Sequence, residues 1–409
     1  MTIDTPDLSA EAGRYLEDVT AKRFPYEFLS RLRKAEPVHQ SSVGTWIISD
    51  LGLATAALRD QRFSRDLAVA NEIEKMFSAA SSATEMYSHK MMNQDGPDHM
   101  RLRRLLAGTF SPGSVREWRP EIEQMVDEVF DEVVPKGAGD LISNIAYPVP
   151  EHLICHLLGA PFSDHALFEK WFGVLNLRPQ AGAHNAERKA EATAALDELA
   201  LYVKGLVSDR RAQPGTDLVS KLVTIEEEGD RLYDVELLAI ITEVINGGHD
   251  TTANTIANAA LILLTYPEVF DELKADVSLV PSFVDEVLRF RSAVQSTLTR
   301  VASDDIEIGG VTIPKGDTVV ISLAGANRTE SAFEDPERFD VHREPNRHIG
   351  FGTGLHACLG AHLARAELQV TVDRIVRRMP DLRLVGTIDD LTWRTTNLVM
   401  APAELPVRW

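Results

Sequence analysis

One long helical pattern in the middle of the chain constrains the fold more than any other feature. Val235–Thr265 carries apolar residues at three- and four-residue spacing, which is the period of an α-helix with a buried face. Asp234 is the predicted N-cap, and Tyr266-Pro267 ends the pattern. At about 1.5 Å per residue this helix is on the order of 45 Å long. The sequence therefore predicts a protein built around one central helix that crosses a whole domain.

The helical period recurs along most of the chain, whereas strand patterns are few. Further helices are predicted at 54–59, 113–134, 186–211, 268–277, 282–291 and 359–379. Weak alternation predicts a strand at Val43–Ser49, and Ile306–Leu323 is typical of a hairpin followed by another strand, with Gly309-Gly310 as the turn. We expect one mainly α domain, 1–409, with small β-sheets in a β-rich N-terminal part at about 35–60 and a hairpin at about 301–325.

Composition excludes several classes of protein. The chain is 44% hydrophobic and 25% charged, which is ordinary for a folded protein. Its formal net charge of −20 argues against nucleic-acid binding, which needs a basic face. The N-terminus has no secretory pattern, and Glu243, Asn246 and Asp250 interrupt the central apolar stretch, so we expect no membrane span and a soluble, cytoplasmic protein. Two cysteines are too few for a disulfide framework or a four-thiolate zinc site.

Cys358 is the residue with the clearest chemical setting. It lies in FGTGLHACLG, Phe351–Gly360, immediately before a helical pattern whose N–H groups and positive end favour a thiolate. The loop glycines permit amides to point at the sulfur, and Gly360 lets the helix approach a large flat group. Such a thiolate suits the proximal ligand of a haem iron. The alternative is a cysteine that is simply buried as a small apolar residue.

The residues around Cys358 match a family signature. Phe351, Gly352, Gly354, His356, Cys358 and Gly360 fit the pattern F-G-x-G-x-H-x-C-x-G, which resembles the haem-binding signature of the cytochrome P450 monooxygenases. Glu286 to Arg289 resembles the family's E-x-x-R motif, and Pro336 to Arg343 resembles its meander. Together with segments from His99 onward, the resemblance covers most of the chain.

The resemblance implies a fold, a cofactor and a structural ion network. The fold is the cytochrome P450 fold, mainly α with small β-sheets, in which haem lies between the long central helix and the helix of the cysteine loop. The cofactor is haem b, with the Cys358 thiolate as axial ligand to the metal and with Phe351, Gly352 and Gly360 in its binding loop. The network joins Glu286, Arg289 and Arg343, and its role is expected to be structural.

A second motif lies within the central helix. Each of Gly247 and Gly248 lowers the stability of a helix by about 1 kcal/mol relative to alanine. Because a purely structural helix would avoid this loss, the two glycines are expected to make room for a group against the backbone. Asp250 and Thr251 resemble the family's acid–alcohol pair, which supplies protons during dioxygen activation. The resemblance implies that both are catalytic and that the two glycines line the oxygen groove. The alternative for Thr251 is back-bonding to a preceding carbonyl, and His249 is expected to be structural.

Haem propionates are carboxylates and require cations and hydrogen-bond donors. Residues 95–112 resemble the family's helix along the propionate edge, where His99 and Arg103 share one helix face. Arg300 and His356 match the remaining propionate partners. Each residue on its own would more often be a surface charge.

Substrate contacts are the least constrained prediction. By family topology the candidates are Met92, Leu175, Val244, Asn246, Val294, Gln295 and Leu398. They suggest a mostly apolar cavity with a few polar groups, although core or loop positions are an equal alternative for any one of them.

The leading hypothesis is a haem-thiolate monooxygenase that uses dioxygen and two external electrons to oxidise a small, mostly apolar organic molecule. No flavin or dinucleotide fingerprint is visible, so the resemblance implies a ferredoxin-type donor served by an NAD(P)H-dependent reductase, docking near Arg101, Arg104 and Arg347. One alternative is a peroxide-using peroxygenase, against which Asp250 and Thr251 argue. The other is a haem protein that binds a gas without catalysis.

Overall fold

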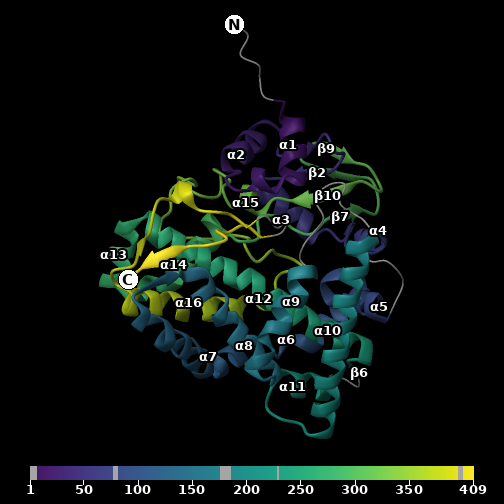
Figure 1. Cartoon of the computed structure of the whole chain (residues 1–409). Helices are drawn as coiled ribbons and strands as arrows, with labels where there is room; N and C mark the ends of the chain where they lie inside the picture. Colours follow the sequence, from purple (N-terminus) through teal and green to yellow (C-terminus); the bar gives the residue numbers. More distant parts are fainter. Residues whose placement is uncertain (1–6, 77–81, 176–185, 228–229, 395–398) are drawn as a thin grey trace.

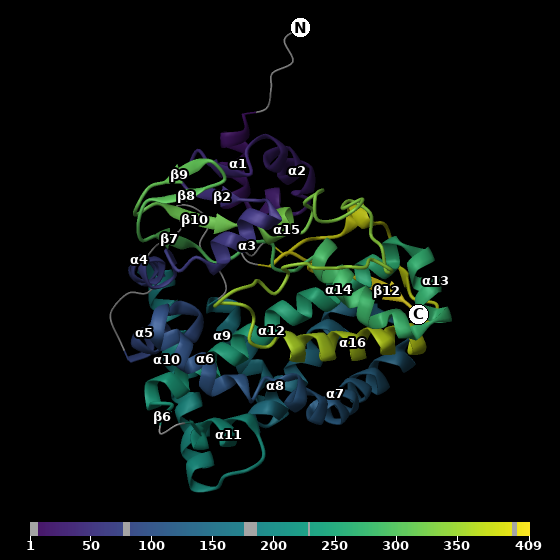
Figure 2. The same ribbon diagram turned by 180° about the vertical axis from the view of Figure 1, so that it is seen from behind.

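The computed structural model describes residues 7–76, 82–175, 186–227, 230–394 and 399–409. Its central element is the 32-residue helix α12, Asp234–Thr265, which runs through the helical part of the molecule beside α16 (Figure 1). The main group of strands and the N-terminal helices gather on one side of this helical part, as the reverse view also shows, whereas the strands labelled β6 (Asp230–Arg231) and β12 (Pro406–Arg408) lie among the helices (Figure 2). No helix in the described ranges has the length and apolarity needed to cross a membrane.

The helices of the described residues include all those predicted from the periodicity, with ends that differ by up to three residues, and several that the periodicity did not predict. Apart from α12 they are α1 Leu8–Glu17, α2 Tyr26–Ala35, α3 Leu51–Arg59, α4 Asp66–Met76, α5 Ser82–Ser88, α6 Gly96–Ala107, α7 Pro112–Val133, α8 Pro148–Leu158, α9 His165–Leu175, α10 Ala186–Ala212, α11 Leu218–Thr224, α13 Pro267–Ala275, α14 Val280–Phe290, α15 Leu323–Ala326 and α16 Ala361–Arg378. One terminus was predicted wrongly: Tyr233, not Asp234, is the N-cap of α12. The Glu236 carboxylate accepts the backbone N–H of Tyr233, which moves the cap one residue earlier.

The strands are short, and several of them pair with segments distant in sequence. They are β1 Val38–Gln40, β2 Trp46–Ile48, β3 Phe63–Ser64, β4 Ala138–Asp140, β5 Glu226–Glu227, β6 Asp230–Arg231, β7 Arg300–Ala302, β8 Ile306–Ile308, β9 Val311–Ile313, β10 Thr318–Ile321, β11 Arg383–Leu384 and β12 Pro406–Arg408. The main sheet has the order β1-β2-β10-β7-β3. Its β10–β2 pair is parallel and brings Val319 beside Trp46. The predicted hairpin forms as β8–β9, with positive φ at Gly309 and Gly310.

The β-rich N-terminal part is narrower than predicted. Within residues 35–60 only β1 and β2 are strands, because the apolar spacing of the second half forms helix α3. Asp50 caps α3 by accepting hydrogen bonds from the N–H groups of Gly52 and Leu53.

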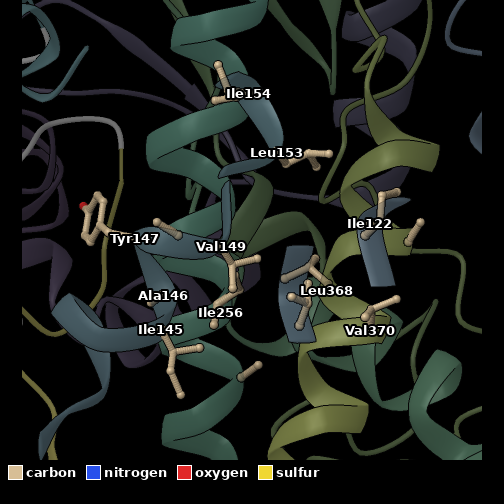
Figure 3. Close-up of a cluster of buried hydrophobic side chains, with 14 of the residues drawn as sticks. Ile122, Ile145, Ala146, Tyr147, Val149, Leu153, Ile154, Ile256, Leu368 and Val370 are labelled. Carbon is tan, nitrogen blue, oxygen red and sulfur yellow. The ribbon is translucent and has the colours of Figure 1, made fainter. Parts of the chain in front are cut away.

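The largest hydrophobic cluster fixes the position of the central helix. Ile256 of α12, Leu153 of α8 and Leu368 of α16 all belong to it and are less than 5% exposed. Figure 3 shows these side chains together with Ile122 of α7. Because α12 is held by three neighbouring helices over its C-terminal half, the glycines and acids near its middle are fixed relative to α16.

A buried carboxyl in α16 predicts an unusual pH dependence of stability. Glu367 is 3% exposed, its Oε1 has no partner among the described residues, and burial raises its pKa to about 8. A carboxyl with a raised pKa stabilises the fold fully below its unfolded pKa, near 4.5, and loses that contribution as the pH rises towards 8. Between pH 5 and 8 the free energy of unfolding of the wild type should therefore fall by up to roughly 4 kcal/mol, and that of Glu367→Gln should not show this fall. Urea unfolding of the haem-loaded protein at both pH values measures this difference, with exposed Glu132→Gln as control. An equal pH dependence in wild type and Glu367→Gln would contradict the assignment.

Candidate active site

The cysteine loop is shaped by glycines that the surrounding chain requires. The Cys358 N–H donates to the Phe351 carbonyl at 2.8 Å, which closes the loop. Gly352 and Gly354 have φ of 69° and 75°, a region that favours glycine. A Cβ on Gly354 would lie 2.5 Å from the backbone oxygen of Leu58. The loop can therefore be held against α3 only with glycine at that position.

The Cys358 thiol is accessible although protein surrounds it. Its side chain is exposed, yet burial is the main effect on its pKa and raises it. The Gly360 N–H and the guanidinium groups of Arg103 and Arg365 act in the opposite direction without reversing the shift. The helix end alone therefore does not produce the predicted thiolate, because desolvation outweighs it. A bound metal ion deprotonates a coordinating thiol outright, so a metal would complete the site.

The four predicted propionate partners lie next to the cysteine loop. The Arg103 guanidinium donates to the Ala357 carbonyl at 2.6 Å, and the ring centroids of His99 and His356 are 4.4 Å apart. Arg300 is 5% exposed and donates to the Phe63 carbonyl at 2.9 Å. Burial, followed by the charge of Arg65, lowers the pKa of Arg300 to about 10. Cations and donors thus converge beside Cys358.

This cluster contains the unpartnered donors that a pair of carboxylates would satisfy. Within the described ranges, both ring nitrogens of buried His99 and Nε of Arg300 have no hydrogen-bond partner. Burial, then the charges of His356 and Arg103, lower the pKa of His99 to about 4, so its ring is neutral near pH 7. A Cβ on Gly360 would meet nothing within 4 Å, which leaves room beside the loop. The residues present therefore fit a haem with its propionates.

Two members of this cluster were missed by the sequence analysis. Asp95 accepts from His356 Nε2 at 3.0 Å, and despite burial the hydrogen bonds from His356 and Ser64 hold its pKa below the usual range. Arg65 is 2% exposed and donates to Asn93 at 3.1 Å. Asp95 is the first residue of the predicted segment 95–112 and stands directly before the observed helix α6, so that position was the one available signal. Nothing in the local sequence distinguishes Arg65 from a surface arginine.

The middle of α12 carries the predicted oxygen-side residues. Gly247 is exposed in the middle of a mostly buried helix, and a Cβ there would meet nothing within 4 Å. Gly248 instead lies against α8, where a Cβ would be 3.6 Å from Ile154. The Thr251 hydroxyl donates to the Gly247 carbonyl at 2.6 Å, which is the back-bonding considered above. Its oxygen can still accept a hydrogen bond on the side of Gly247.

Asp250 is held by three groups that the sequence did not reveal. Its Oδ1 accepts from the Tyr147 hydroxyl at 2.8 Å, from Asn254 at 2.9 Å and from Arg394 at 3.1 Å. Burial raises the pKa of Asp250, and the charge of His249 and the Asn254 hydrogen bond oppose this rise. The Arg394 side chain is 35% exposed, so one partner of the carboxylate reaches towards solvent.

His249 contacts a buried carboxyl of α8. Its Nε2 lies 3.1 Å from Glu151 Oε1, with both side chains under 10% exposed. This contact ties α12 to α8. Glu151 is therefore the specific partner through which His249 would play the predicted structural role.

The predicted ion network comes together at the centre of the meander. Arg289 donates to both Glu286 oxygens, at 2.8 and 2.7 Å, and Arg343 donates to Oε1 at 3.2 Å. The Asp340 N–H and the Asn346 amide add donors at 2.9 and 3.1 Å. Glu286 and Arg289 side chains are both 0% exposed. The carboxylate thus fastens α14 to the chain that leads into the cysteine loop.

The predicted substrate residues come from several elements, and their role stays a prediction. Met92 is half-buried, and its N–H donates to Glu243 of α12. Asn246 follows Glu243 by three residues on the same helix. Val244 packs against the main core, and Leu175 packs on buried Met86 and Leu196. Val294 packs on the core of the main sheet, and Gln295 is buried. Leu398 lies outside the described residues.

Comparisons with known proteins agree with this geometry. A family model described as Cytochrome P450 matches residues 37–380. Cytochrome P450 107B1 of Saccharopolyspora erythraea is 36% identical over 416 residues, covering 100% of this chain and 99% of the relative. Nocardicin C N-oxygenase of Nocardia uniformis subsp. tsuyamanensis is 38% identical over 366 residues, with 89% of each chain covered.

A solved structure is similar over nearly the full length. The myxobacterial cytochrome P450 CYP267B1 in complex with myristic acid superposes with a TM-score of 0.89 at 33% identity, covering 97% of this chain and 98% of that one. The likeness therefore includes both the helical part and the small sheets.

Proposed function

The chain belongs to the cytochrome P450 family, and from that premise we propose that it hydroxylates or otherwise oxidises a mostly apolar small organic molecule with two electrons from a separate protein. Family membership makes the chain an oxygen-incorporating oxidoreductase whose cofactor is haem with the Cys358 thiolate as axial ligand. The observation that carries the proposal is the accessible Cys358 thiol within a glycine loop beside unpartnered propionate donors.

Bound haem supplies the redox and dioxygen chemistry, and the chain supplies binding and orientation. His99, Arg103, Arg300 and His356 are proposed to hold the propionates. Three of these side chains are supported by contacts within the cluster, and His99 by its two free ring nitrogens. Asp95 is proposed to orient the His356 ring by accepting a hydrogen bond from its Nε2–H group.

Asp250 and Thr251 are proposed to deliver protons to the oxygen side of the pocket. Thr251 Oγ1 is fixed by its hydrogen bond to the Gly247 carbonyl and keeps lone pairs that can hold a donor in line. Asp250 is positioned by Tyr147 and Asn254, and burial keeps its pKa raised, so it binds a proton more readily than a surface aspartate. Arg394 is proposed to mark the route by which protons reach this carboxyl from solvent.

A ferredoxin-type donor with an NAD(P)H-dependent reductase is the proposed electron source. The predicted basic surface needs revision, because Arg101 pairs with Asp230 and Glu236, and Arg104 pairs with Asp230. Their charges are compensated on the side of α12 and β6. Arg347, which is exposed close to the cysteine loop, remains the candidate docking charge.

The carbon monoxide difference spectrum of the dithionite-reduced protein tests the haem-thiolate assignment. We expect a Soret band displaced far to the red in the wild type, and its loss in Cys358→Ser, because only an anionic sulfur donor produces that displacement. Cys155→Ser is the matched control: Cys155 is 2% exposed in α8, and burial raises its pKa to about 12. A displaced band that survives Cys358→Ser would overturn the assignment.

A further inference from the structure

The face of α12 that carries Thr251 also carries hydrogen-bond acceptors with nothing to accept. Asn246 and Gly247 follow Glu243 by three and four residues, and each precedes Asp250 or Thr251 by four. These residues therefore share one face of the helix. At Gly247 that face borders open space, since a Cβ would meet nothing within 4 Å. Buried polar groups without partners are rare in proteins and call for an explanation.

Glu243 is only half satisfied. Its Oε1 accepts the N–H of Met92 at 3.1 Å, whereas Oε2 is buried and has no hydrogen-bond partner in the described part of the chain. Burial raises its pKa to about 7, and the charge of Lys90 and the backbone N–H groups of Met92 and Met91 oppose this rise. Lys90 is 3% exposed, and its ammonium lies 4.8 Å from the centroid of the Tyr87 ring. Among the ion pairs of the described residues, none joins Lys90 to Glu243 within 4.0 Å.

Asn246 differs from the other asparagines of the same helix. Asn254 donates to Asp250, and Asn258 donates to the carbonyls of Arg291 and Met400 at 3.2 and 2.9 Å. These two amides fasten α12 to its surroundings. Asn246 Oδ1 is buried and, over the described ranges, accepts no hydrogen bond. An amide that holds no structure together, one turn from Glu243 and beside open space, is placed to meet a ligand.

We propose that Glu243 and Asn246 are specificity-determining residues that accept hydrogen bonds from the substrate, which is therefore an apolar molecule carrying a hydroxyl, amide or amine donor. This inference rests on the proposed monooxygenase function and narrows its substrate class. Glu243 precedes Thr251 by eight residues, which is about 12 Å along the helix. The donor group and the oxidised atom should be separated by a comparable distance.

Matched ligand pairs test this selectivity on the haem-loaded protein. The probes are testosterone with its 17-methyl ether, and 1-decanol with decyl methyl ether, each titrated by the spin-state shift of the ferric haem. A site with unpaired acceptors favours the ligand that can donate, so we expect the wild type to bind each alcohol about tenfold or more tightly than its ether. Glu243→Leu and Asn246→Leu should each reduce that ratio, and Glu243→Gln should keep part of it. Equal binding of alcohol and ether by the wild type would overturn the proposal.

A stability comparison decides the question if no probe shifts the spectrum. Removing an unsatisfied acceptor relieves a cost, whereas removing a bonded one creates unpaired partners. We expect Asn246→Leu to leave the Tm of the ligand-free holoprotein unchanged or higher, and Asn258→Leu, the matched control, to lower it. An equal fall in both variants would make Asn246 structural and overturn the proposal. Failure of the proposed function is separate, because it would show as a missing red-shifted carbon monoxide band in the wild type.

Discussion

A Glu286→Ala variant is expected to lose its haem and to unfold at a much lower urea concentration than the wild type. The Glu286 carboxylate is fully buried and receives hydrogen bonds from Arg289, Arg343, the Asp340 N–H and the Asn346 amide. Removing it leaves the buried charge of Arg289 without a counter-charge. Such a loss costs roughly 3–5 kcal/mol of the free energy of unfolding. The meander would then no longer hold the cysteine loop in place.

Haem per polypeptide and the urea midpoint measure the effect. Glu123→Ala is the control, because Glu123 belongs to an exposed i,i+4 pair with Arg119, and its loss should change stability by less than about 0.5 kcal/mol. Should Glu286→Ala yield no folded protein, Glu286→Gln preserves the shape and removes the charge. Full haem content and a wild-type midpoint in Glu286→Gln would show that the network is not required.

A Thr251→Ala variant should consume NAD(P)H and dioxygen but release hydrogen peroxide instead of oxidised product. The Thr251 hydroxyl is the hydrogen-bonding group beside the open space at Gly247, and alanine can neither hold a donor there nor pass on a proton. Positioned acid catalysis typically contributes 10²- to 10⁴-fold, so we expect coupled product formation to fall by about 10²-fold or more. The measurement is the ratio of hydrogen peroxide to product, with a ferredoxin and its reductase as electron source.

Thr252→Ala is the matched control for this effect. Thr252 is the next residue of α12 and 5% exposed, so its loss perturbs the helix without reaching the open space. Asp250→Asn should resemble Thr251→Ala, because it removes the carboxyl that Tyr147 and Arg394 position. Undiminished coupling in Thr251→Ala would refute the relay. A full rate with peroxide alone would favour a peroxygenase, and turnover of no compound under either condition would favour a gas-binding protein.

The helices were predictable because their signal is local. The three- and four-residue spacing of α7, α10, α12 and α16 placed each within two residues of its observed ends. The hairpin β8–β9, the strand β10 that follows it and the strand β2 were predicted, whereas the other strands were not. Strands such as β3 and β7 have two or three residues, and each pairs with a segment more than two hundred residues away. A period of two cannot be recognised over so short a length.

The candidate site divides in the same way. Three sets of residues could be found as patterns, because the members of each set stand within a few residues of one another. They are Cys358 with its glycines, Asp250 with Thr251, and Glu286 with Arg289. Three other contacts could not be found as sequence patterns, because each joins distant parts of the chain. They are Asp95 with His356, Arg65 with Arg300, and Arg394 with Asp250. The thiolate predicted at Cys358 agrees with the haem cofactor of the family, whereas the burial that raises the pKa of the metal-free thiol depends on the folded chain.

The sequence by itself determined the family, the cofactor and the long central helix, because these depend on residue types at fixed local spacing. Only the tertiary structure decided how each buried charge is compensated: Asp250 by Tyr147, Asn254 and Arg394, and His249 by Glu151. It also decided which polar atoms of α12 accept no hydrogen bond from the described residues, such as Oδ1 of Asn246, whereas the Asn258 amide donates to the Met400 carbonyl. Desolvation and hydrogen bonding depend on every atom nearby, and those atoms are brought together by packing rather than by order along the chain.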